Sequence, residues 1–222
     1  MNNIAHRDSA STDFDYGNPG DVALSGDWNC NGEETPGAYR QSDGFVYLRM
    51  TNTQGIADRQ FYFGNPGDFP VVGDFNGDGC DTVSIYRPAT TEFHIINSLA
   101  NNNEGLGAAT AVYIFGNYGD TPFAGDFDGD GVDTVGLHRQ TTGLVYYRNS
   151  HTQGVADNSF VFGDGGDRFV AGDWDGDGDD TAAVYRPSNG TFYIKLANAT
   201  GVADVSFHVG SFDTVVIAPR KP

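Results

Sequence analysis

A short acidic loop occurs four times in this chain, and its oxygen-bearing side chains are spaced like the ligands of a cation. The copies are GDWNCNGEET from Gly26, GDFNGDGCDT from Gly73, GDFDGDGVDT from Gly125 and GDWDGDGDDT from Gly172. Carboxylate or amide oxygens on alternate residues suit a hard cation that takes six to eight oxygen ligands. The glycine that follows them permits a sharp turn. The loops therefore predict bound calcium.

The candidate ligands occupy equivalent positions in the four loops. They are Asp27, Asn29, Asn31, Glu33 and Glu34 in the first loop; Asp74, Asn76, Asp78, Cys80 and Asp81 in the second; Asp126, Asp128, Asp130, Val132 and Asp133 in the third; and Asp173, Asp175, Asp177, Asp179 and Asp180 in the fourth. We expect three strong Ca²⁺ sites, with the third loop the strongest. The first loop should be weakest, because Asn29 and Asn31 replace acids and Cys30 replaces a glycine.

Composition and charge narrow the possible partners. The 222 residues carry a formal net charge of −18, with a pI near 4.2, so a phosphate backbone would be repelled and nucleic acid is excluded. A hydrophobic content of 38% is enough for a packed core. A solvated acidic surface would explain solubility, but it would not explain the regular spacing of the acids. Crowded carboxylates destabilise a fold unless a counter-ion lies among them.

The two cysteines, Cys30 and Cys80, stand at different positions of the first two loops. Because the sequence alone does not bring their Cβ atoms together, we expect two unpaired thiols. No apolar stretch approaches the roughly 20 residues of a membrane-spanning helix, so membrane insertion is not expected. The first residues lack the apolar core of a secretory signal. Either a signal has been removed, or the chain begins inside a larger protein.

Between the acidic loops, each repeat contains four short segments with alternating apolar residues, which predict β-strands. In the third repeat these are FAGDF, TVGLHR, LVYYRNS and SFVFG. The leading aspartates of the loops are 47, 52 and 47 residues apart. Four-stranded antiparallel units at this spacing predict an all-β, propeller-like domain. We place it at residues 13–222, after a flexible segment 1–12, with units at about 22–64, 69–116, 122–163 and 168–210.

The chain resembles the FG-GAP/VCBS repeat family, which also forms the propeller of integrin α-subunits. The resemblance rests on FGNPGD at Phe63, FGNYGD at Phe115 and FGDGGD at Phe162, each followed by an acidic loop. It implies calcium in the hairpin that joins the first two strands of each blade. The family loop reads D-x-D-x-D-G-x-x-D, whereas here the last acid stands one residue earlier. The departure leaves the role of these final acids open.

We expect four full blades plus a partial fifth repeat. FDYG at Phe14 is equivalent to the last strand of a unit, and TVVIAP from Thr214 is equivalent to a first strand. A small ring with an abbreviated fifth blade, a strand-swapped assembly and a fragment of a larger ring all fit this pattern. Open blade edges would favour self-association.

Every unit also ends its second strand with an aromatic residue followed by arginine. The pairs are Tyr39–Arg40, Tyr86–Arg87, His138–Arg139 and Tyr185–Arg186. A repeated ligand-binding ring is one interpretation. We favour arginines that pair with local carboxylates and aromatic rings that pack between blades. Trp28 and Trp174 share a position with Phe75 and Phe127 and are expected to pack beneath the loops.

These observations favour a non-enzymatic, calcium-stabilised repeat domain of an extracellular or cell-surface protein. It would serve adhesion or binding, or act as an accessory module of a secreted protein. The expected partner is a glycan or a cell-surface protein. The alternative is a polysaccharide-active enzyme, either a glycosidase or a lyase, on a propeller scaffold. Such an enzyme would need acid and base residues that depart from the repeat.

Overall fold

The computed structural model describes residues 14–100 and 108–210, and within these ranges every regular element is a β-strand. The predicted all-β class is therefore confirmed. The predicted flexible segment 1–12 lies outside the described residues. So does the partial fifth repeat expected after residue 210.

The strands form four antiparallel sheets, each with its four strands in chain order. The first sheet contains β1 (Val22–Gly26), β2 (Thr35–Arg40), β3 (Phe45–Leu48) and β4 (Arg59–Tyr62). The second contains β5 (Phe69–Gly73), β6 (Thr82–Arg87), β7 (Glu92–Ile95) and β8 (Ala111–Ile114). The third contains β9 (Thr121–Gly125), β10 (Thr134–Arg139), β11 (Leu144–Tyr147) and β12 (Asn158–Val161). The fourth contains β13 (Arg168–Gly172), β14 (Thr181–Arg186), β15 (Thr191–Ile194) and β16 (Val205–His208).

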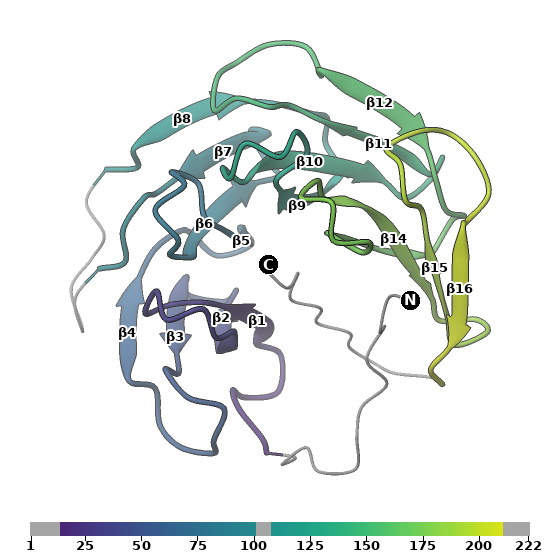
Figure 1. Cartoon of the computed structure of the whole chain (residues 1–222). Helices are drawn as coiled ribbons and strands as arrows, with labels where there is room; N and C mark the ends of the chain where they lie inside the picture. The colour runs from purple at the N-terminus through teal and green to yellow at the C-terminus, as the bar shows by residue number, and fades with distance from the viewer. Residues whose placement is uncertain (1–13, 101–107, 211–222) are drawn as a thin grey trace.

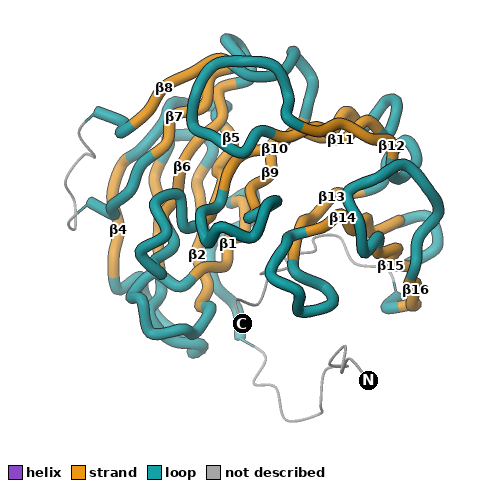
Figure 2. Tube along the Cα trace, turned by 45° about the horizontal axis from the view of Figure 1, so that its top comes forward, coloured by secondary structure: helices purple, strands orange, loops and turns teal. Residues whose placement is uncertain are grey.

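The four sheets are the blades of a β-propeller (Figure 1). The first strand of each blade lies toward the centre, and the fourth lies at the rim. The inner strands contact one another in the order β1, β5, β9 and β13. Figure 2 shows the same ring after a turn about the horizontal axis, with each sheet joined to the next by loops. Four-bladed propeller architecture thus agrees with the sequence prediction.

The hydrophobic core is divided among the three junctions between successive blades. One cluster joins Tyr39 and Leu48 of the first blade to Val83 and Ile85 of the second. Two further clusters join the second blade to the third and the third to the fourth. Each repeat therefore buries its apolar face against its neighbours, as expected of a repeat protein.

The glycine that begins the second and third acidic loops is required by the next blade, whereas in the first and fourth loops a Cβ on Gly26 or Gly172 would meet the tryptophan of its own loop. A Cβ on Gly73 would lie 2.7 Å from a carboxylate oxygen of Asp133, and one on Gly125 would lie 2.6 Å from a carboxylate oxygen of Asp180. Contacts this short do not occur with real Cβ atoms. The Gly-Asp start of the loop thus lets the acid of the next blade approach its backbone.

An arginine–aspartate ion pair repeats in every blade. The pairs are Arg40–Asp21, Arg87–Asp68, Arg139–Asp120 and Arg186–Asp167. Each pair joins the last residue of the second strand to the residue directly before the first strand of the same blade. The aromatic residues Tyr39, Tyr86 and Tyr185 are fully buried. The packing interpretation of this motif is confirmed.

The described residues contain no helix that is long and apolar enough to cross a membrane.

Candidate metal centres and the junctions between acidic loops

The first aspartate of each loop organises the loop backbone. In the third loop, the Asp126 carboxylate accepts hydrogen bonds from the backbone N–H groups of Gly129, Asp130 and Gly131 at 2.8, 3.2 and 2.8 Å. Asp173 accepts the equivalent three bonds in the fourth loop. The backbone therefore curls around the leading carboxylate and turns the alternate side chains inward.

In two loops this curl brings three carboxylates together. Asp126, Asp128 and Asp130 each offer an oxygen within 4.8 Å of the other two. Asp173, Asp175 and Asp177 do the same in the fourth loop. Such an all-oxygen set fits a hard cation, which would take its remaining ligands from backbone carbonyls or water.

The electrostatics of these triads also favour a cation. Burial, and then the charges of Asp130 and Asp126, raise the pKa of Asp128 above its ordinary value. Burial and the charges of Asp177 and Asp173 raise the pKa of Asp175 in the same way. Like charges disfavour one another's ionisation, and a bound cation reverses that effect.

The first two loops have the same curl but fewer acids. Asp27 accepts hydrogen bonds from the backbone of Asn31 and Gly32, and Asp74 accepts them from Asn76, Asp78 and Gly79. The side chain of Asn76 donates to Asp78 at 2.9 Å. In the first loop, Glu33 accepts a hydrogen bond from the amide of Asn52, in the loop between β3 and β4. Asn29 is exposed.

The final acids of the second, third and fourth loops bond across the blade boundary. Asp81 accepts from the backbone N–H of Asp27 at 2.7 Å, Asp133 from Asp74 at 2.7 Å and Asp180 from Asp126 at 3.0 Å. The backbone N–H of each final acid donates in return to the carbonyl of the same partner. These acids therefore bind each loop to the loop before it.

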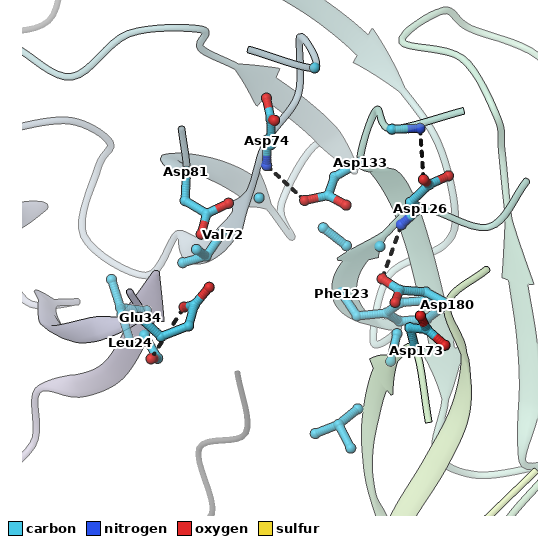
Figure 3. Close-up of a pocket in the computed structure, with 18 of the residues that line it drawn as sticks. Leu24, Glu34, Val72, Asp74, Asp81, Phe123, Asp126, Asp133, Asp173 and Asp180 are labelled. Carbon is cyan, nitrogen blue, oxygen red and sulfur yellow. Dashed lines mark hydrogen bonds between the residues drawn. The ribbon is translucent and has the colours of Figure 1, made fainter. Parts of the chain in front are cut away.

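The same acids face a cavity of about 580 Å³ at the hub of the ring, shown in Figure 3. Leu24, Val72 and Phe123 supply part of its apolar wall. Glu34, at the position of the final acid in the first loop, also lines it and accepts a hydrogen bond from Ser25 of its own blade. Burial, and then the charge of Asp133, raise the pKa of Asp180 to about 7.

The expectation of two unpaired thiols is wrong, because Cys30 and Cys80 form a disulfide between the first two blades. Their Cα atoms are 4.6 Å apart, although 50 residues separate them in sequence. Closing a loop of this length lowers the conformational entropy of the unfolded chain, which stabilises the folded protein by on the order of 4 kcal/mol. The thiol of Cys80 is therefore not available to a metal, which leaves its backbone carbonyl as the possible ligand.

This disulfide marks a contact that recurs at each junction. The seventh residue of one loop lies against the fourth residue of the preceding loop, counting from the leading aspartate. Cys80 meets Cys30 in this way; a Cβ on Gly77 would lie 3.1 Å from Val132, and a Cβ on Gly129 would lie 2.5 Å from Asp179. Cys30 has a φ of 64°, close to the 71° of Gly77 and the 69° of Gly129. Cys30 thus adopts the left-handed conformation that the other loops assign to glycine.

This equivalence predicts a second inter-blade disulfide. In a protein that carries Gly77→Cys and Val132→Cys, we expect spontaneous oxidation to link the second and third loops, because Gly77 matches Cys30 and Val132 matches Cys80. Mass spectrometry of the non-reduced peptides would detect the bond. The matched control is Gly79→Cys with Val132→Cys, since a Cβ on Gly79 meets no atom within 4 Å. Equal cross-linking in both variants would contradict the proposed equivalence.

Sequence reasoning missed the side chains that support the acidic loops from the rim. Asn52 donates to Glu33 and to the carbonyl of Glu34, and Asn198 donates to the carbonyl of Asp180. Both asparagines belong to the loop between the third and fourth strands of their blade. Each asparagine stands four residues after the end of the third strand, and this shared position was visible in the sequence.

Comparison of the chain with protein-family models gives no match, and no curated protein sequence matches it significantly.

Proposed function

We propose that this chain is a calcium-binding propeller domain of the FG-GAP/VCBS type that acts as an extracellular binding or adhesion module. The main support for this proposal is that the carboxylate oxygens of Asp126, Asp128 and Asp130 lie close together. Those of Asp173, Asp175 and Asp177 do the same in the fourth loop. Ca²⁺ suits these loops because it takes six to eight oxygen ligands in a flexible geometry, whereas Mg²⁺ demands a near-ideal octahedron.

In this proposal the metal is first of all structural. Its ligands come from one hairpin, and the final acid of that hairpin holds the preceding blade. Ordering the hairpin by calcium therefore also orders the junction. A second role follows from charge, since a chain with a net charge of −18 repels anionic groups unless a cation lies between them.

The proposed partner is a glycan or a cell-surface protein, bound at sites that recur around the ring. Equivalent weak sites on successive blades would combine through avidity. A glycan array probed with the purified protein, with calcium and with chelator, tests the glycan arm. Binding that requires calcium would support a lectin-like module. Binding unaffected by chelator would contradict a metal-bridged ligand, and absence of sugar binding would direct the search to protein partners.

One observation favours the enzymatic alternative. Asp133 and Asp180 face the hub cavity, and a carboxyl group with a pKa of about 7 suits general acid catalysis. Both residues, however, follow the repeat and bond to the backbone of a neighbouring loop, so a structural role accounts for them. Hydrolysis of a polysaccharide panel that is lost in Asp180→Asn, without loss of folding, would make the enzyme the better description.

A further inference from the structure

His138 differs in kind from its equivalents in the other three blades. It occupies the position of Tyr39, Tyr86 and Tyr185, at the next-to-last residue of the second strand, and it is fully buried. Its ring lies against Phe169 of the fourth blade, with ring centres 5.3 Å apart. His138 is therefore part of the packing between the third and fourth blades.

In two of the other blades the longer tyrosine side chain reaches a backbone carbonyl, whereas the Tyr39 hydroxyl has no hydrogen-bond partner among the described residues. The Tyr185 hydroxyl donates to the carbonyl of Gly210 at 2.8 Å, and the Tyr86 hydroxyl donates to that of Asn117 at 3.4 Å. For His138, neither ring nitrogen has a hydrogen-bond partner among the described residues. A buried polar group without a partner destabilises the folded state, and a buried charge without one does so much more.

The charged groups around His138 are already engaged with one another. Asp120 lies just before β9 and accepts two hydrogen bonds from Arg139, and Asp167 lies just before β13 and accepts two from Arg186. Tyr146 of β11 also donates to Asp120. Burial lowers the pKa of His138, although the charges of Asp167 and Asp120 act in the opposite direction.

We propose that His138 makes the junction between the third and fourth blades acid-labile, so that mildly acidic conditions open the propeller there first. Opening exposes the imidazole to water, where it takes up a proton. In the closed junction, burial disfavours the charged imidazole more than Asp167 and Asp120, which are paired with Arg186 and Arg139, favour it, and no described residue accepts a hydrogen bond from the ring. Tyrosine at the equivalent position of the other blades does not titrate in this range. His151, at the junction between the second and third blades, has its pKa lowered by burial as well, but its Nε2 lies 3.1 Å from the carbonyl oxygen of Phe75, which can accept a hydrogen bond from the protonated ring.

The direction of the pH effect follows from linkage. The pKa of His138 is lower in the closed protein than the ordinary value of 6.5. The contribution of His138 to the stability of the junction is therefore fully present above pH 6.5, where the ring is mainly neutral in both states. That contribution is lost as the pH falls below 6.5, because the opened state binds a proton that the closed state does not.

The test compares the wild-type protein with His138→Tyr between pH 7.5 and pH 5.0, in the presence of chelator. We expect His138→Tyr to melt at a higher temperature, and the difference to widen by about 2–4 °C for each pH unit below 6.5. His208→Tyr, at an exposed position of β16, is the matched control. The difference between variants cancels the titration of the remaining histidines and of Asp180.

Hydrogen exchange locates the effect. At pH 5.5, the amides of β10 and β13 should exchange faster in the wild type than in His138→Tyr, while those of β2 should exchange equally. A melting difference that is constant with pH, or one that His208→Tyr reproduces, would overturn the proposal. Should the tyrosine variant not fold, His138→Phe removes the same titration and gives the same comparison.

Discussion

Removal of calcium is expected to lower the melting temperature of this protein by about 10–20 °C. A cation present at about 100 times its dissociation constant stabilises the folded state by about 2.7 kcal/mol per site. The two aspartate triads alone would thus contribute about 5 kcal/mol, and for a chain of this size 1 kcal/mol corresponds to roughly 2–4 °C. Differential scanning calorimetry with calcium, with chelator and after readdition measures the shift.

Single substitutions assign this stabilisation to the loops. Asp130→Asn removes one charge from the triad of the third loop and should reduce the shift caused by calcium. Asp43→Asn, an exposed acid in the turn between β2 and β3, should leave the shift unchanged. A melting curve that chelator does not move, in protein shown to have lost its bound metal, would contradict a structural role for calcium.

Arg139→Ala is expected to destabilise the protein by about 3 kcal/mol, which would lower the melting temperature by roughly 6–12 °C. Arg139 donates two hydrogen bonds to Asp120, at 2.8 and 2.9 Å, and the Asp120 side chain is only 1% exposed. Burial alone would raise the pKa of Asp120, but the hydrogen bonds from Arg139 and Tyr146 lower it. The variant leaves this carboxylate buried without its principal counter-charge.

Two further variants separate the buried charge from the loss of a side chain. Adding Asp120→Asn to Arg139→Ala removes the unpaired charge and should recover part of the stability. Lys195→Ala breaks the ion pair with Asp204, whose side chain is 40% exposed, and should cost less than about 1 kcal/mol. If Arg139→Ala were as mild as Lys195→Ala, the repeated ion pair would not be a significant element of the fold.

The blade architecture could be predicted because each repeat encodes it locally. The alternation of apolar residues in TVSIYR or TVGLHR defines a strand. The Gly-Asp start of the loop and its Asp-Gly core, which is Asn-Gly in the first loop, define the hairpin that follows β1, β5, β9 and β13. The repetition of Arg and its aromatic neighbour in every unit was enough to indicate packing and ion pairing. These features depend on residues within one blade.

The specific bonds between the loops of neighbouring blades could not be predicted, because nothing local in the sequence specifies which residues meet. The Cys30–Cys80 disulfide joins the fourth residue of one loop to the seventh of the next, and this equivalence is visible only when the loops lie side by side. For the same reason, the bonds from Asp133 and Asp180 to the preceding loops were not foreseen. In His138 the departure from tyrosine was visible in the sequence, but its lack of a hydrogen-bond partner was not.

Crystals grown with calcium would show directly where cations bind. Anomalous difference density should show an ion within Asp126, Asp128 and Asp130, and another within Asp173, Asp175 and Asp177. The second loop, with Asp74, Asn76 and Asp78, should show a third ion, and the first loop the weakest density. Ordered loops without anomalous density at either triad, in calcium well above millimolar concentration, would contradict the central claim that these hairpins are calcium sites.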